Sequence, residues 1–240
     1  MFVNCYVKKF DEVNVEIKND YSLSFEKEYN DNIKNIVRWL IKNKNKVTVN
    51  QIVDNFFNET KYEVFLSHSH ADTNKVVNLA RILEKNYKCK VFIDSIFWAN
   101  IYDLLKEFDN IYSKVNDNDN YDYQKRNFTT SNLFIILNTA LHTMIEMSDY
   151  FFFLETKQST KEDSSLISPW IFSELSFATQ VRRREPEDKF FENYLPNQKQ
   201  KALESRASLE SLDELNFIYK IPKLDYVLSS EEFSKLINKN

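Results

Sequence analysis

The 240-residue sequence predicts an α/β fold in which a central parallel sheet lies between layers of helices. Two observations support this prediction. From residue 62 onwards, short apolar runs alternate with longer segments whose apolar residues recur at helical spacing. The composition is 42% hydrophobic and 15% aromatic, which is enough for a large buried core at this length. We therefore expect one α/β domain with additional segments at both ends.

The first sixty residues are expected to form an N-terminal appendage made of a hairpin and two helices. Val13, Val15 and Ile17 alternate with polar residues, which predicts a strand with one solvated face. Apolar residues at helical spacing predict a first helix over 25–41. A capping box over 48–51 predicts the start of the second helix.

The segment 61–184 is expected to be the α/β domain. Its strands are predicted at 62–67, 89–94 and 149–154, and its helices at 72–86, 101–115, 129–147 and 168–184. Ser168 and Pro169 mark the start of the last of these helices, as N-cap and first helical residue. The extra helix and the polar tract that follows it form an expected insertion over 100–128.

The remaining residues, 185–240, are expected to form a C-terminal helical extension that packs on the α/β domain. The first part of this extension has a helical composition, and residues 216–227 could hold one interrupted strand. Ser229 and Glu232 have the spacing of a capping box, which predicts a short last helix.

The sequence contains no glycine, and this absence excludes several ways of binding a nucleotide. P-loops, Rossmann turns and EF-hand loops all need glycine, for close approach of the backbone or for a sharp bend. A nucleotide would therefore be held by side chains at the strand ends. Asparagine, which tolerates left-handed backbone better than most residues, is expected to replace glycine at turns and helix caps.

The net charge and the lengths of the apolar runs indicate which partners and which cellular location to expect. With 32 basic and 36 acidic residues the net charge is −4, so neither nucleic acid nor an anionic membrane is an expected partner. No apolar run approaches the roughly 18 residues of a membrane span, and no export signal follows Met1. Cys5 and Cys89 form no CxxC pair, which suits a reducing compartment. We expect a cytoplasmic protein.

The helix that begins at Ser168 carries a carboxylate on its apolar side. At 100° per residue, Glu174 falls within the apolar arc and one turn after Trp170. A buried carboxylate is costly unless it is paired or has a function. Glu174 could be satisfied by an arginine or a backbone N–H. It could instead serve a cationic ring attached to a ribose, with the indole stacked on the ring and the carboxylate at C1′.

Polar residues also lie at the carboxyl ends of two predicted strands, where parallel sheets bind ligands. Ser67 and His68 end the first of these strands, and Asp94 ends the second. These residues could face a substrate, or they could only cap turns. His68, His70 and His142 could ligate a metal, but no acidic residue or cysteine stands at a telling spacing, so no metal is expected.

Taken together, these residues resemble a bacterial TIR (Toll/interleukin-1 receptor-like) domain over roughly residues 61–184. Residues 62–72 (YEVFLSHSHAD) resemble the first TIR motif, and residues 91–94 (VFID) resemble the second. Residues 168–175 (SPWIFSEL) match the S-x-W-x-x-x-E-L segment of enzymatic members. The resemblance implies a flavodoxin-like three-layer fold. The family usually has Pro or Gly in the loop after the second motif, and residues 95–100 have neither.

The resemblance also implies an activity, cleavage of the nicotinamide–ribose bond of NAD, as in the NAD-consuming anti-phage defence (Thoeris-like) type. It identifies Glu174 as the catalytic glutamate and Trp170 as the aromatic residue at the nicotinamide. Ser67, His68 and Asp94 correspond to strand-end positions near the ligand. NAD would be a substrate, with no permanently bound cofactor. Homo-oligomers on activation and a downstream effector that senses the product are further expectations.

Two other functions fit the same features. One is a non-catalytic TIR adaptor or scaffold that recruits partners through its surfaces. The other is an enzyme of similar fold that transfers N-glycosyl groups between nucleosides. Turnover of NAD would separate the leading hypothesis from both.

Overall fold

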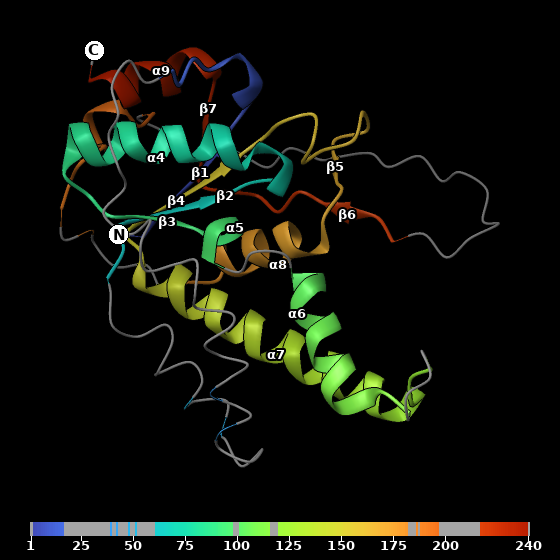
Figure 1. Cartoon of the computed structure of the whole chain (residues 1–240). Helices are drawn as coiled ribbons and strands as arrows, with labels where there is room; N and C mark the ends of the chain where they lie inside the picture. Colours follow the sequence, from blue (N-terminus) through green and yellow to red (C-terminus); the bar gives the residue numbers. More distant parts are fainter. Residues whose placement is uncertain are drawn as a thin grey trace. The chain divides into compact units, whose positions relative to one another are not determined.

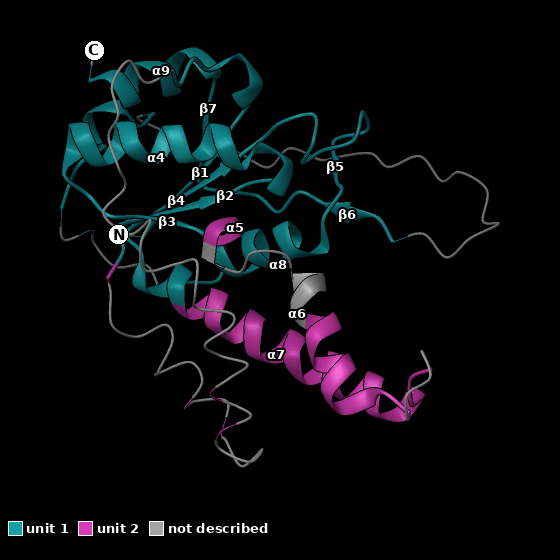
Figure 2. Ribbon diagram, in the orientation of Figure 1, with its two compact units in different colours: residues 1–23, 62–93, 144–240 teal, residues 24–61, 94–143 magenta. Residues whose placement is uncertain are grey.

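The computed structural model divides the chain into two compact units, coloured separately in Figure 2. Unit 1 contains residues 1–23, 62–93 and 144–240, and unit 2 contains residues 24–61 and 94–143. The residues that the structure describes are 2–16, 39, 42, 48, 51, 61–97, 101–115, 120–181, 186, 188–196 and 217–239.

A parallel sheet of five strands forms the centre of unit 1 (Figure 1). Its order is β3-β2-β4-β1-β7, and the strands are β1 (Val3–Val7), β2 (Val64–Ser67), β3 (Val91–Ile93), β4 (Tyr150–Leu154) and β7 (Tyr226–Leu228). Helices flank the sheet, so the predicted α/β fold with a central parallel sheet is confirmed. The layers are compatible with a flavodoxin-like three-layer fold, but the strand order differs from the flavodoxin-like 2-1-3-4-5, because the first strand of the chain lies between β4 and β7.

The strand β1 shows that the start of the chain belongs to the sheet and is not a separate appendage. It lies between β4 and β7 and is parallel to both. The alternating residues at 13–16, predicted as a strand, form none, and Ile17 lies outside the described residues. Alternation marks a strand with one solvated face, whereas β1 (VNCYV) is a central parallel strand in which even the polar Asn4 is buried.

Aromatic side chains of β4 build the core on both faces of the sheet. Phe152 packs against Phe191 and against Phe233, with ring centroids 5.5 Å apart in both pairs. Phe151 points to the other face and stacks on Phe65 of β2 at 5.4 Å. The side chains of β4 are all buried, as expected for a strand that has another strand on each side.

Helices cover both faces of this sheet, with α4 and α9 on one face and α8 on the other (Figure 1). The bounds are α4 (Thr73–Tyr87), α8 (Pro169–Ala178) and α9 (Ser230–Asn238). The predicted start of α8 is confirmed, because the Ser168 side chain accepts a hydrogen bond from the Trp170 N–H. The helix ends at Ala178, earlier than the predicted 184, and residues 182–185 lie outside the described part.

The C-terminal segment contributes strands as well as a helix, so it is part of the α/β fold and not a helical extension alone. The strand β7 is the fifth strand of the sheet, and β6 (Tyr219–Lys220) pairs antiparallel with β5 (Ser165–Leu166). The single strand predicted at 216–227 is therefore two strands in two sheets. Pro222 lies between them, because proline has no N–H to donate to a ladder.

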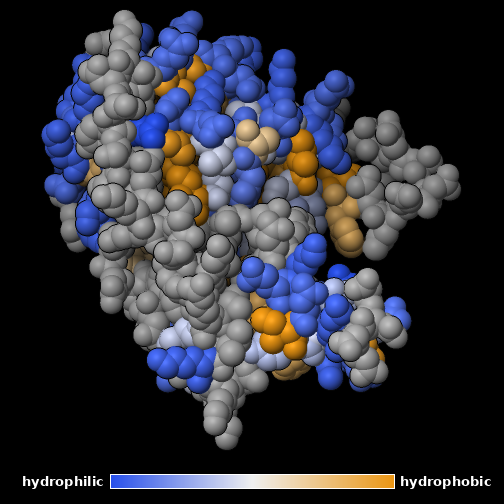
Figure 3. Space-filling model, viewed as in Figure 1, coloured by the Kyte–Doolittle hydropathy of each residue, from blue (hydrophilic) through white to orange (hydrophobic). Residues whose placement is uncertain are grey.

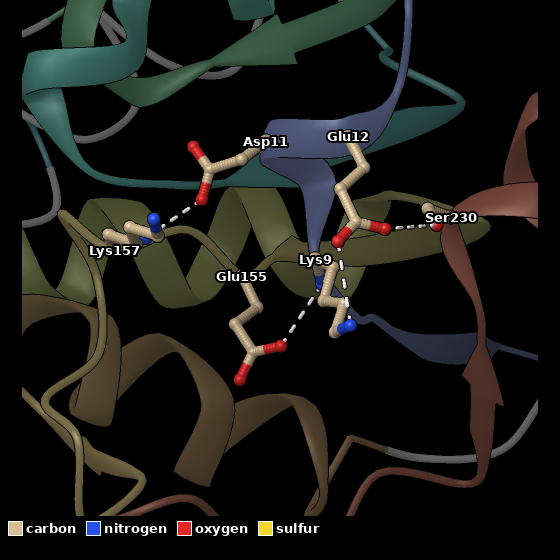
Figure 4. A network of polar contacts seen from close by, with 6 residues as sticks. All are labelled: Lys9, Asp11, Glu12, Glu155, Lys157 and Ser230. Carbon is tan, nitrogen blue, oxygen red and sulfur yellow. Dashed lines mark hydrogen bonds and ion pairs between the residues drawn. The ribbon is translucent and has the colours of Figure 1, made fainter.

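Polar contacts hold the turn after β1 against neighbouring segments (Figure 4). The turn includes the 3-10 helix η1 (Phe10–Glu12). Its backbone N–H at Lys9 donates to the Glu155 carboxylate, 3.1 Å away, and its Asp11 carboxylate accepts from the Lys157 N–H at 3.0 Å. Ser230, the first residue of α9, donates its hydroxyl to Glu12. The start of the chain is thus joined to the loop after β4 and to the last helix.

Left-handed backbone occurs at lysines and a serine, not at asparagines. Among the described residues, φ is positive at Lys9, Lys88, Ser164 and Lys239. Lys88 and Lys239 are the C-caps of α4 and α9, where a cation interacts favourably with the helix dipole. Within the described part of the chain, the expectation that asparagine replaces glycine at such positions is wrong.

Unit 2 contains the whole of the predicted insertion over 100–128. Its helices are α5 (Asp94–Phe97), α6 (Ile101–Phe108), a π-helical turn (Asp109–Ser113) and the first part of α7 (Tyr123–Met147). The helix α7 begins before the predicted residue 129, because the Asp122 carboxylate accepts a hydrogen bond from the Lys125 N–H. Arg126 in its first turn pairs with the buried carboxylate of Asp109 at 2.9 Å.

Of the two helices predicted at 25–41 and after 48, most residues lie outside the described part of the chain. The capping box itself is confirmed. The Gln51 N–H donates to the Thr48 hydroxyl at 3.2 Å, and the Thr48 N–H donates to the Gln51 side-chain oxygen at 2.9 Å.

The predicted capping box at Ser229 is also confirmed, and it leads to a first testable prediction. The Ser229 hydroxyl accepts from the Glu232 N–H, and the Glu232 carboxylate accepts from the Ser229 N–H. Replacing Ser229 by Ala is expected to lower the free energy of unfolding by about 1 kcal/mol, because a donor in the first turn of α9 loses its partner. Urea unfolding measures this change, and a loss below the error of the method would contradict it.

Candidate functional site

The candidate site lies at the strand from which successive strands of the chain are placed on opposite sides in the sheet. From β2 the chain passes to β3 on one side, and β4 lies on the other side. In open α/β sheets this switch point leaves a crevice at the carboxyl ends of the strands, where ligands bind. Ser67 is the last residue of β2 and is paired in register with Phe153 of β4. The end of β2 therefore carries a hydroxyl at the position where a ligand is expected.

Ser67 and Glu174 form a buried hydrogen-bonded pair. The Ser67 hydroxyl donates to Oε2 of Glu174 over 2.6 Å, and the two residues are 0% and 1% exposed. Side chains alternate along a strand, so Ser67 points to the same face of the sheet as Phe65, two residues earlier. That face is covered by α8, which carries Glu174. The predicted position of Glu174 on the buried face of its helix is confirmed.

The burial of Glu174 has an energetic consequence. Moving a carboxylate out of water costs several kcal/mol, even after the surrounding protein has relaxed. The Ser67 hydroxyl gives the Glu174 side chain one hydrogen bond over 2.6 Å. When Glu174 carries its charge, the low solvent content around it makes its attraction for a positive charge strong.

Trp170 lies one helical turn before Glu174, in the first turn of α8. Residues four apart share a face of a helix, so the indole and the carboxylate project to the same side. The Trp170 side chain is only half-buried, whereas Glu174 is fully buried. The helix thus presents an aromatic surface next to a carboxylate, the combination that the sequence predicted.

His68 follows Ser67 and is also buried. Its Nδ1 lies 3.0 Å from the backbone oxygen of Leu66. Because a carbonyl oxygen only accepts, Nδ1 carries the proton, and in the neutral ring Nε2 is the acceptor. The exposed ring of His70 stacks on His68 with centroids 6.4 Å apart.

Sequence reasoning missed a contact between the loops that follow β2 and β4. The buried Thr156 donates its hydroxyl to the Asp72 carboxylate over 2.6 Å. Asp72 precedes α4, but its side chain makes no capping bond to that helix. No local pattern marks this pair, because the partners are far apart in the sequence. The contact fixes two of the loops that border the carboxyl end of the sheet.

The structure places Asp94 differently from the other predicted site residues. Ser67, His68, Trp170 and Glu174 all belong to unit 1, whereas Asp94 is the first residue of the second segment of unit 2. It follows β3 directly, as predicted, and its side chain is buried. Instead of ending the strand, Asp94 is the first residue of α5. A role for Asp94 in the site stays a prediction.

A metal centre does not emerge from the described residues. No group of three or more His, Cys, Asp or Glu side chains among them is arranged to hold a metal ion. Burial lowers the pKa of His142, which belongs to unit 2. His68 and His70 stack on each other, and their ring contact provides an interaction that involves no metal.

Both cysteines are buried, and this gives a second prediction. Burial raises the pKa of Cys89 to about 12 and raises that of Cys5 above its ordinary value as well. The folded protein therefore keeps both thiols protonated at pH 8, and we expect slow alkylation by iodoacetamide until denaturant is added. Rapid alkylation of both cysteines in the native protein would contradict this expectation.

The raised pKa values also determine how stability changes with pH. In the unfolded chain the thiols ionise near pH 9, whereas Cys89 in the folded chain stays protonated to about pH 12. Its contribution to stability is fully present below pH 9 and is lost as the pH rises from 9 to about 12.

Figure 3 shows that the described surface on this side is largely hydrophilic, with hydrophobic residues in small groups. Among the described residues of unit 1, the exposed large hydrophobic ones are Ile167, Phe217 and Ile218. Within the described part of the chain, no helix has both the length and the apolar character needed to cross a bilayer.

Comparisons with models of protein families, with curated proteins and with solved structures find no match to this chain.

Proposed function

We propose that this chain is a TIR-domain enzyme of the bacterial type that cleaves the nicotinamide–ribose bond of NAD. One observation carries the proposal, the buried Glu174 carboxylate hydrogen-bonded to Ser67 at the switch point of the sheet. The position of Trp170 one turn earlier and the resemblance of residues 61–184 to TIR motifs support it.

The chemistry of the pair suits an N-glycoside whose base is cationic while bound and leaves as a neutral molecule. As the C1′–N bond of NAD breaks, its electron pair moves to the pyridinium nitrogen, and positive charge develops on the ribose. A carboxylate held nearby stabilises that charge, and its effect is large where water is excluded. The Trp170 indole stacks on the nicotinamide ring, whose positive charge favours the face of an aromatic ring. His68, next to Ser67 at the end of β2, is proposed to bind the ribose hydroxyls.

The second half of the reaction adds a nucleophile to C1′. If water attacks, it loses a proton and the products are nicotinamide and ADP-ribose. If a nitrogen of the adenine attacks, the proton is lost from the adenine instead of from water, and the products are nicotinamide and a cyclic form of ADP-ribose with one water less. The proposal extends to a cytoplasmic enzyme in anti-phage defence that assembles into homo-oligomers and either depletes NAD or makes a signal for an effector protein.

Release of nicotinamide from NAD by the purified protein tests the proposal. We expect liquid chromatography to show nicotinamide and an ADP-ribose product in equal amounts, with and without a crowding agent that promotes assembly. NAD that stays intact under both conditions would overturn the proposal. Adenosine and deoxyadenosine serve as comparison substrates, because base exchange on these nucleosides without NAD turnover would indicate an N-glycosyl transferase instead.

A further inference from the structure

The last carbonyl of α8 lies in the interior of the protein. The final carbonyls of a helix have no partner within the helix and need one elsewhere. Among the described residues after α8, backbone hydrogen bonds go to the oxygens of Leu175 and Phe177 and not to that of Ala178, and residues 182–185 lie outside the described part. Ala178 is 1% exposed, so its oxygen would lose a hydrogen bond on burial if nothing in the protein replaced water.

Asn4 supplies the missing donor. Its Nδ2 lies 3.0 Å from the Ala178 oxygen, and the Asn4 side chain is 4% exposed. The other end of the same amide accepts a hydrogen bond from the Asp225 N–H, directly before β7. Asn4 therefore joins three elements, since it is on β1 and binds both the end of α8 and the residue that leads into β7.

Glu174 and Ala178 are four residues apart, which is about one helical turn. The helix is held to the sheet at both of these positions, by Ser67 of β2 at Glu174 and by Asn4 of β1 at Ala178. Asn4 is paired in register with Phe151 of β4, and Ser67 is paired with Phe153. The two anchors thus lie on opposite sides of β4 and on the same face of the sheet.

We propose that Asn4 is a positioning residue for the site. It fixes α8 along its axis and in rotation, so that the Glu174 carboxylate stays in reach of Ser67 and of the reacting C1′. The effect of Asn4 on catalysis rests on the proposed function. The role of Asn4 in holding α8 in place does not depend on any activity. It also assigns a role in the site to the N-terminal strand, which lies outside the segment that resembles TIR domains.

Without Asn4, α8 keeps its apolar contacts but loses a fixed point one turn from the carboxylate. Small displacements of a catalytic group are costly, since about 1 Å corresponds to a rate loss of about 10²-fold. Because Asn4 does not touch the substrate, its loss lowers kcat and leaves KM nearly unchanged. If the residue served stability alone, its replacement would change neither kcat nor KM of the folded protein.

The experiment compares Asn4→Leu, which has nearly the same shape but no hydrogen-bonding groups, with Cys5→Ala. Cys5 is the next residue of β1, is fully buried and points to the opposite face of the sheet, so its loss tests damage to the strand itself. Two readouts are measured for each variant, the kinetics of nicotinamide release and hydrogen exchange of the α8 amides. The second readout does not depend on any activity.

For Asn4→Leu we expect a fall in kcat of about 10- to 100-fold with KM within about threefold, together with faster exchange in α8. Cys5→Ala is expected to leave both close to wild type. Unchanged exchange in α8 would overturn the proposal, as would an equal fall in kcat for Cys5→Ala. If Asn4→Leu does not fold, Asn4→Ala is used, since a smaller side chain lets water reach the Ala178 oxygen.

The two proposals can fail separately. If wild-type protein leaves NAD intact, the proposed function is wrong, and the exchange of the α8 amides still decides whether Asn4 holds the helix. If wild-type protein cleaves NAD and folded Asn4→Leu keeps its kcat, the proposed function stands and the positioning role of Asn4 is wrong.

Discussion

Replacing Glu174 by Gln is expected to reduce nicotinamide release from NAD by on the order of 10³-fold. Glutamine has nearly the same size as glutamate, and its side-chain oxygen can still accept the hydrogen bond from Ser67. It carries no charge, so it cannot stabilise the positive charge that develops at C1′. The rate is measured by chromatography at saturating NAD, because the proposed role concerns the transition state.

The control for this variant is a second buried glutamate. Glu84 of α4 is also buried, but α4 covers the opposite face of the sheet from α8. Glu84→Gln therefore makes the same chemical change away from the site, and we expect it to keep nicotinamide release within about threefold of wild type. A Glu174→Gln protein that is folded and retains more than a tenth of the wild-type rate would show that Glu174 is not catalytic.

Stability adds a separate expectation for Glu174→Gln. The substitution removes a charge that is costly to bury, so the variant is expected to unfold at the same temperature as wild type or above it. Lost activity together with unchanged or raised stability is typical of functional residues and does not occur when a core residue is damaged. Circular dichroism measures the melting temperature of both proteins.

The parts of the site that could be predicted from the sequence have local signals. Glu174 stands out because a carboxylate at helical spacing among apolar residues must face the core. Ser168 and Pro169 mark the start of that helix by their own chemistry. Ser67 follows a short apolar run, and a parallel sheet places the end of such a run at its ligand-binding edge. Each of these inferences needs only neighbouring residues.

The parts that could not be predicted depend on partners that are distant in the sequence. Asn4 and Thr156 act through contacts with residues 174 and 84 positions away, and no spacing reveals such pairs. The strand β1 was missed for a related reason. The polar Asn4 in the middle of β1 is buried, so polarity does not mark a solvated face there, and the alternation after residue 12 was a misleading signal.

The central place of β1 in the sheet makes this strand necessary for the folding of unit 1. Deleting residues 2–8 is expected to prevent unit 1 from folding cooperatively, because β1 connects β4 to β7. Four residues of this segment, Phe2, Val3, Cys5 and Val7, are buried apolar side chains. Burial of an apolar side chain contributes about 1.5–3 kcal/mol, so their loss removes much of a total stability of about 5–15 kcal/mol.

A point variant makes the same test in the full-length chain. Cys5→Asp introduces a charge at a fully buried position of β1, whereas Glu12→Ala changes an exposed residue just beyond the strand. Isolated charges in the interior cost far more than exposed substitutions, which usually change stability by less than about 0.5 kcal/mol. We expect Cys5→Asp to abolish the cooperative thermal transition and Glu12→Ala to retain it. A cooperative transition near the wild-type temperature in both the deletion and Cys5→Asp would mean that β1 is a dispensable appendage. The sheet would then have to hold β7 without β1, although in the structure β1 is the strand that joins β7 to β4.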